Sequence, residues 1–287
     1  MVIKFWGIRG SIPVPGTETV KYGGNTPCVQ IISDNGENFI IDAGTGIRAL
    51  GKELCKNSGN DEIYLFLSHT HWDHIQGLPF FEPLFQKNTK MTVYMNDVIV
   101  PEKIFEAQLH PSFFPIEKDV LASEINYKII NDGIKIRIGS IDISTIKVHH
   151  TSGTLSYKFT ENGKIIVYMT DNEILCCDGV NYPDKKIIED NNKNLIEFCR
   201  GADYLIHDCM YNLKDFKQKK GWGHSNNVSV AYFSQLAKVK NLILFHYEPD
   251  YNDAAIDLLE SETRNILEKE NSGIRCSASK EGMIIKL

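Results

Sequence analysis

The sequence of 287 residues is short of several features that would assign it to a common class of protein. Its seven cysteines are an odd number and include no C-x-x-C pair, which disfavours a zinc knuckle and indicates reduced thiols. It also has no excess of basic residues. A net charge of −6 argues against a long nucleic-acid backbone as the main partner without excluding one.

Long apolar stretches are missing too. No run of about 18 apolar residues occurs, and Gly7 and Gly10 interrupt the N-terminus before an apolar stretch reaches the length of a signal peptide. We therefore predict a cytoplasmic protein that does not cross a membrane. The apolar content of 42% and charged content of 24% are those of an ordinary globular protein.

Histidine is scarce as well, with nine in the chain, yet three of them lie in the short stretch FLSHTHWDH (66–74). His69, His71, Asp73 and His74 follow directly on an apolar run. Imidazole and carboxylate together suit zinc, and also iron or manganese. One ion rarely takes four side chains from six positions. The stretch therefore predicts two neighbouring ions, one held by His69 and His71 and the other by Asp73 and His74.

The pattern of apolar residues predicts alternating strands and helices. The expected strands are 2–7, 28–33, 38–44, 62–68, a strand-rich block over 125–170, 202–208, 241–246 and 281–287. The expected helices are 45–56, 184–200, 226–238 and 252–270. This order predicts an α/β protein in which two mixed sheets lie face to face with helices on their outer faces. Because no repeat or low-complexity linker interrupts it, residues 1–287 are expected to form a single domain.

Side chains that can bind metals recur where the predicted strands end. They are His69, His149 with His150, Asp171, His207 with Asp208, and His246. Ligands collect beyond the strand ends of open α/β sheets, so these positions predict one shared site. Asp42 also ends an apolar strand, and we interpret it as a carboxylate that orients the histidine loop without binding metal.

The motif SHTHWDH (68–74) resembles the H-x-H-x-D-H signature of the metallo-β-lactamase superfamily. His150 in VHHTSGTLSY, Asp171 in YMTDNE and His246 in LFHYEPD follow in the order found in that superfamily. The resemblance covers nearly the whole chain and implies a four-layer αββα sandwich.

The resemblance also implies a set of metal ligands. One divalent ion would be held by His69, His71 and His150, and a second by Asp73, His74 and His246, with Asp171 bridging them. Zinc is the first choice of metal, and manganese or iron are the alternatives. His149 is the alternative to His150, which stands beside the small-residue turn TSG that the superfamily pattern favours.

Two further motifs, LIHDCMY (205–211) and GWGHS (221–225), resemble the phosphodiesterase branch of the superfamily, which includes the tRNA-processing nuclease RNase Z. This likeness implies that His224 lies over the phosphate and that Asp208 orients it. Both are expected to be catalytic residues, together with Asp73. RNase Z has a tRNA-gripping arm between the equivalents of His150 and Asp171. Here that interval of 21 positions has room only for two strands and a tight turn.

We therefore expect a dinuclear-metal hydrolase that acts on a small or cyclic phosphodiester, by attack of a water or hydroxide that bridges two metal ions. The alternatives are a ribonuclease of the RNase Z type, a thioesterase or lactonase, and a metabolite-binding protein that does not turn its ligand over. A homodimer is left open. Asn25 and Thr26 are expected to line the site.

Overall fold

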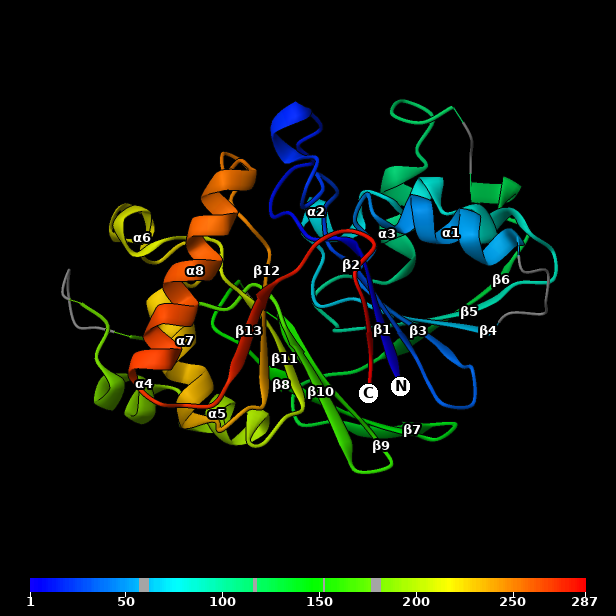
Figure 1. Cartoon of the computed structure of the whole chain (residues 1–287). Helices are drawn as coiled ribbons and strands as arrows, with labels where there is room; N and C mark the ends of the chain where they lie inside the picture. Colours follow the sequence, from blue (N-terminus) through cyan, green and yellow to red (C-terminus); the bar gives the residue numbers. More distant parts are fainter. Residues whose placement is uncertain (57–61, 116–117, 152, 177–181) are drawn as a thin grey trace.

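The computed structural model describes residues 1–56, 62–115, 118–151, 153–176 and 182–287. Two seven-stranded mixed sheets face each other, and helices cover the outer side of each (Figure 1). This arrangement confirms the predicted αββα sandwich. The two ends of the chain lie side by side, because the first strand, β1 (Val2–Gly7), pairs antiparallel with the last, β14 (Ile284–Lys286).

The first sheet has the strand order β14-β1-β2-β3-β4-β5-β6. Its other strands are β2 (Cys28–Ile32), β3 (Asn38–Ile41), β4 (Glu62–Phe66), β5 (Lys90–Met95) and β6 (Glu124–Ile129). The pairs from β3 to β6 are parallel. The α-helices of this half are α1 (Ile47–Lys56), α2 (Trp72–Ile75) and α3 (Glu102–Gln108), and its 3-10 turns are Thr17–Thr19, Leu78–Phe80, Glu82–Phe85 and Lys118–Val120.

The second sheet has the strand order β13-β12-β11-β10-β9-β8-β7. The strands are β7 (Lys135–Ile138), β8 (Ile141–Lys147), β9 (Leu155–Glu161), β10 (Lys164–Met169), β11 (Tyr204–Asp208), β12 (Asn241–Phe245) and β13 (Arg275–Ala278). The pairs from β10 to β13 are parallel. The helices beside this sheet are α4 (Lys185–Asn191), α5 (Lys193–Cys199), α6 (Leu213–Lys219), α7 (Asn227–Leu236) and α8 (Asp253–Lys269).

Three details differ from the sequence-based expectation. The helix predicted over 184–200 is two helices, because Asn192 ends α4 and bonds through its side chain to Leu175 and to the Ile188 carbonyl. The strand-rich block over 125–170 is divided, with β6 in the first sheet and β7 to β10 in the second. Strands β5 and β13 and helices α3 and α6 were not predicted. β13 is only four residues long, with the sequence RCSA.

An aromatic cluster between the sheets fixes the strand that leads into the histidine loop. Phe66 at the end of β4 stacks on Tyr94 with ring centroids 4.5 Å apart, and it meets Tyr157 and Phe159 of the facing sheet edge-on at 5.3 and 5.8 Å. All four side chains are buried. Because such contacts stabilise cores, the chain after Phe66 leaves the sheet at a fixed position. Within the described residues, none of the helices has the length and hydrophobicity needed to cross a bilayer.

Candidate metal centre

The seven predicted ligands come together at one end of the sandwich. The loop after β4 supplies His69, His71, Asp73 and His74, while the second sheet supplies His150 after β8, Asp171 after β10 and His246 after β12. Potential ligand atoms within 4.8 Å of one another form three groups, one of which joins Asp171 and His246 to Asp208 and His224. The other two groups consist of predicted ligands alone. The first consists of His69, His71, His150 and Asp171. The second consists of Asp73, His74 and His246.

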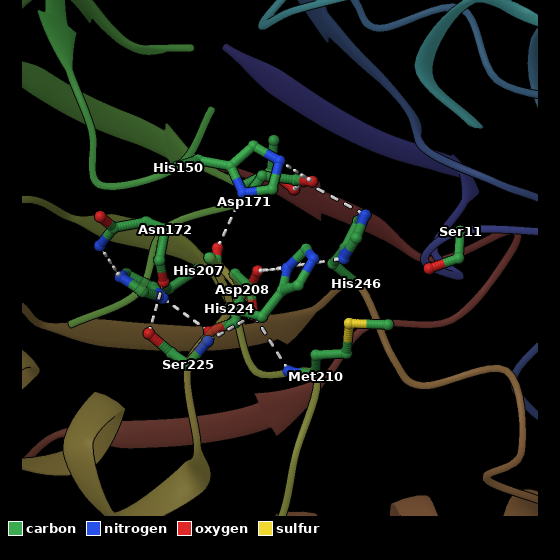
Figure 2. A network of polar contacts seen from close by, with 12 residues as sticks. Ser11, His150, Asp171, Asn172, His207, Asp208, Met210, His224, Ser225 and His246 are labelled. Atoms are coloured by element: carbon green, nitrogen blue, oxygen red, sulfur yellow. Dashed lines mark hydrogen bonds and ion pairs between the residues drawn. The ribbon is translucent and has the colours of Figure 1, made fainter. Parts of the chain in front are cut away.

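Asp171 faces both groups at once. Its Oδ2 atom lies 3.6 Å from Nε2 of both His69 and His150. Its Oδ1 atom lies 3.2 Å from Nε2 of both His74 and His246. Figure 2 shows the carboxylate between the rings of His150 and His246. One carboxylate therefore presents a separate oxygen to each group, as a bridging ligand does.

The spacing of these atoms fits a metal ion. Zinc bonds of about 2.0–2.1 Å at tetrahedral angles place neighbouring ligand atoms roughly 3.3 Å apart. The distance from His71 Nδ1 to His150 Nε2 is 3.2 Å, and His74 Nε2 lies 3.3 Å from His246 Nε2. His69 Nε2 is buried without a hydrogen-bond partner among the described residues. A buried, unpaired nitrogen is costly, and a cation between these atoms would use its lone pair.

The electrostatics of the first group also suit a cation. Burial lowers the pKa of His69 well below its usual value and that of His150 to about 4, despite the attraction of Asp171. Both imidazoles are therefore neutral at pH 7. Burial alone would raise the pKa of Asp171, but His246 and His74 hold it well below its usual range. Neutral imidazoles and an ionised carboxylate are the forms that bind divalent metals.

Three carboxylates converge on His74 in the second group. Burial disfavours a charge on His74, yet Asp73, Asp171 and Asp42 raise its pKa well above the usual value. Asp73 is itself fixed, because its Oδ2 accepts a hydrogen bond from the Ser11 backbone at 2.8 Å. Such a concentration of negative charge around a buried imidazole is typical of a cation site.

Asp42 occupies the orienting position that the sequence suggested. It follows β3, is fully buried, and its carboxylate lies 2.8 Å from Nδ1 of His74, whose Nε2 faces the ligand group. It also accepts hydrogen bonds from Ser68 N at 2.7 Å, Ser68 Oγ at 2.9 Å and the Tyr168 hydroxyl at 2.7 Å. The contact with Tyr168 joins the two sheets beneath the site, and no sequence motif signalled it.

His224 lies beside both groups. Its ring stacks on His246 at 5.1 Å between centroids with 17° between planes, and it lies 5.1 Å from the His150 ring. Nδ1 of His224 lies 2.6 Å from the Asp208 carboxylate, which leaves Nε2 for the site (Figure 2). Burial alone would lower the pKa of His224, but Asp208, supported by Asp171, raises it to about 9.

The loop that carries His224 is tied to the first ligand group. Nδ1 of His150 lies 3.1 Å from the Gly223 carbonyl, which fixes the orientation of that imidazole. The carboxylate of Glu173 accepts hydrogen bonds from the backbone of Gly221 and Gly223 at 2.9–3.0 Å. Sequence reasoning missed both contacts. The sequence signal for a special loop conformation was the pair of glycines in GWGHS, and in the structure each has a φ of 87°.

The other candidate histidines lie outside these groups. His149 is half-buried, its backbone N–H donates to the Asn172 side chain, and it belongs to none of the groups whose ligand atoms lie within 4.8 Å. His207 is fully buried, with Nδ1 2.7 Å from the Asp208 carbonyl and Nε2 3.3 Å from the Asn172 amide. The geometry therefore selects His150 over His149 and gives His207 a purely structural environment.

Asn25 and Thr26, which were expected to line the site, make their hydrogen bonds to other parts of the chain. Thr26 is fully buried, and its backbone N–H and hydroxyl both bond to Thr45. Asn25 donates to the Glu281 carboxylate from its backbone and from its side chain. Both residues thus brace the loop after β1 against neighbouring segments.

Comparisons with known proteins identify a family and a fold for this chain. The family model of the beta-lactamase superfamily domain matches residues 37–247, which include all seven candidate ligands. Ribonuclease Z of Picrophilus torridus is 27% identical over 296 aligned residues, covering 92% of this chain and 90% of that protein. The fold is similar to that of a diphosphatase from the PhnP family, with a TM-score of 0.65, 18% identity, and 100% and 97% of the two chains covered. It is also similar to zinc-bound PqqB from Methylobacterium extorquens, with a TM-score of 0.68, 14% identity and 100% of both chains covered.

Proposed function

This chain belongs to the beta-lactamase superfamily and is a metal-dependent hydrolase, and from that premise we propose that it cleaves a small or cyclic phosphodiester. The observation that carries the proposal is the pair formed by His224 and Asp208. It places a buried imidazole with a raised pKa directly against both groups of candidate ligands. A proton donor in that position suits cleavage of an ester whose leaving group departs as an alkoxide.

We propose that two divalent ions, with zinc as the first choice, occupy the centre. His69, His71 and His150 would hold one and Asp73, His74 and His246 the other, with Asp171 between them. The zinc-bound relative of the same fold supports the choice of metal. When bound, the ions would supply Lewis-acid chemistry, lowering the pKa of a water and neutralising charge on the phosphoryl oxygens.

The roles of the side chains follow from their contacts. Asp208 accepts from Nδ1 of His224 and from the backbone of Met210 and Ser225, so it is held in place while it orients the imidazole. His224 would then carry a proton on Nε2 and transfer it to the departing oxygen. We infer that Asp73 positions the reacting centre through its contact with His246, 3.2 Å away.

The first test is the variant His224→Ala. It should lose hydrolysis of bis-p-nitrophenyl phosphate by at least about 100-fold, since general acid catalysis contributes that much or more. Mass spectrometry under native conditions should still detect the bound metals, because His224 is outside the proposed ligand set. The matched control is His110→Ala, an exposed histidine after α3.

Full activity of His224→Ala would overturn its assigned role. The same assay should include thioesters and lactones, since members of this fold act on different bonds. Preference of the wild type for a thioester or lactone over the diester would replace the proposed substrate class.

A second candidate function is RNA processing, favoured by the relatives named Ribonuclease Z. Against it, the described residues between His150 and Asp171, 151 and 153–170, include β9, β10 and a tight turn in which Asn162 and Gly163 have φ of 50° and 75°, and no further helix or strand. Gel assays with structured RNA would separate this candidate from the small diester.

The antiparallel pairing of β1 with β14, which joins the two ends of the chain, leads us to propose residues 1–287 as a single domain. A cytoplasmic location stays a prediction.

A further inference from the structure

Two of the three tryptophans are largely exposed. Trp72 is 64% and Trp222 63% exposed, whereas Trp6 is half-buried and donates its indole N–H to Gln30. Large aromatic side chains bury well, and exposed ones that cluster mark surfaces that bind something. Trp72 stands between two proposed ligands, His71 and Asp73, and Trp222 is two residues before His224.

Each of the two tryptophans is the sequence neighbour of a residue on the more exposed side of the centre. His71 is exposed, whereas His69 and Asp171 in the same group are buried. From His71 the contacts run 3.2 Å to His150, and from His150 3.1 Å to the carbonyl of Gly223, the neighbour of Trp222. Trp72 is therefore next in sequence to His71, at one end of this series of contacts, and Trp222 is next to Gly223, at the other end. The series runs along His71 and His150, the two less buried residues of the first group.

Lys219 lies between Trp222 and Tyr211. The Lys219 ammonium lies 5.9 Å from the Trp222 ring and 4.9 Å from the Tyr211 ring, and it is paired with Glu248 at 2.7 Å. Tyr211 in turn meets the edge of His224 at 6.1 Å between centroids. A wall of two side chains, Lys219 and Tyr211, thus links Trp222 to the proposed proton donor.

The charge of the surrounding loops limits the ligand. The segments that carry the proposed ligands and the His224 pair contain no lysine or arginine; they are 68–77, 149–154, 171–176, 207–212, 221–226 and 246–252. A chain with many phosphates is bound through lysine and arginine that neutralise each phosphate. Lysines do follow these segments in α6 and at Lys220, but Lys219, which lies near the Trp222 ring, is paired with Glu248. A site with so few free cationic groups suits one phosphodiester, whose single charge the metal centre would balance.

We propose that Trp72 and Trp222 bind the flat aromatic base of a nucleoside phosphodiester that carries a single phosphate. Indole rings stack on any base, because every base offers a π-face. The proposal rests on the proposed phosphodiesterase function and adds the substrate class and two specificity-determining residues. Removing one stacking ring typically weakens binding roughly tenfold or more.

The test compares two esters with the same leaving group, thymidine 5′-p-nitrophenyl phosphate and methyl p-nitrophenyl phosphate. The ratio of their kcat/KM values isolates the nucleoside, because the departing group and the charge are identical. The wild type should prefer the thymidine ester. Trp72→Ala and Trp222→Ala should each lower the ratio roughly tenfold, and Trp222→Phe should retain part of it.

Leu258→Ala is the control, an exposed apolar side chain on α8 outside the wall described above, and it should leave the ratio unchanged. A ratio near one in the wild type, or a ratio that neither tryptophan variant changes, would overturn the proposal.

A binding measurement separates failure of this proposal from failure of the proposed function. In a Trp6→Phe protein loaded with zinc, only Trp72 and Trp222 emit tryptophan fluorescence. Thymidine 5′-phosphate should quench it saturably, and ribose 5-phosphate should not. Quenching without hydrolysis of either diester would refute the phosphodiesterase but not the base site. Hydrolysis without quenching, or tighter binding of a structured RNA than of the nucleotide, would refute the base site.

Discussion

Asp42 shows how one residue can set the geometry of several others. Its carboxylate lies within 2.7–2.9 Å of donors on Ser68, Tyr168 and His74, and its own φ is 61°. A non-glycine residue with positive φ is uncommon and is tolerated where the surroundings require it. Here the buried hydrogen bonds hold the residue in place, so the histidine loop is aimed before any metal binds.

The protonation of the single residue His224 also predicts how the stability of the metal-free protein depends on pH. Its pKa is raised to about 9 in the metal-free protein, chiefly by Asp208 acting against burial. The folded-state value exceeds the unfolded value of about 6.5, so protonation of His224 stabilises the metal-free fold. This contribution, on the order of 3 kcal/mol, is fully present below about pH 6.5 and is lost as the pH rises through about 9.

NMR titration of the His224 ring in metal-free protein should therefore give a midpoint near pH 9. In Asp208→Asn the midpoint should fall, because the partner charge is gone and burial remains. A wild-type midpoint at or below about 6.5 would contradict the assigned pairing.

Among the structural elements, the GWGHS loop is where backbone conformation affects the candidate centre most directly. Gly221 and Gly223 share a φ of 87°, which side chains other than glycine rarely adopt. Their surroundings differ. A Cβ at Gly223 would lie 2.1 Å from Nδ1 of His150, whereas a Cβ at Gly221 would meet nothing within 4 Å.

Alanine at each position makes a matched pair. Both Gly221→Ala and Gly223→Ala should lose roughly 1–2 kcal/mol of unfolding free energy from the strained φ. Only Gly223→Ala should also displace His150 and lose diester hydrolysis together with part of the bound metal. Equal activity of the two variants would show that the contact between this loop and His150 does not matter for the centre.

At the scale of the whole molecule, the candidate ligands come from both sheets. The loop after β4 belongs to the first sheet, while His150, Asp171 and His246 follow strands of the second. Bound metal would therefore join the two halves of the sandwich and stabilise only the folded state, since the unfolded chain has no such arrangement.

Chelation should accordingly lower the melting temperature of the whole protein. At a free metal concentration of roughly 1,000 times Kd, binding contributes about 4 kcal/mol to the unfolding free energy. Scanning calorimetry with and without EDTA would measure the loss. In Asp171→Asn, EDTA should have a smaller effect than in the wild type, because the carboxylate that faces both groups is gone. An unchanged wild-type melting temperature after complete metal removal would refute the structural part of this prediction.

Local patterns were sufficient for most of the elements. Apolar runs bounded by turn residues predicted β1, β2 and β4 to within two residues, and helical spacing predicted α7 and α8. The unpredicted β13 has only four residues, so its strand conformation depends on pairing with β12 rather than on its own pattern.

The sequence by itself determined the superfamily and the residue types of the candidate centre, because metal ligation demands particular side chains at fixed spacings in a loop. It also determined the short β9–β10 hairpin, because chain length limits what 21 positions can form. Only the tertiary structure decided between His149 and His150 and brought the Gly223 carbonyl against the His150 ring. These outcomes depend on which segments pack together across the two sheets, and no local pattern encodes such distances.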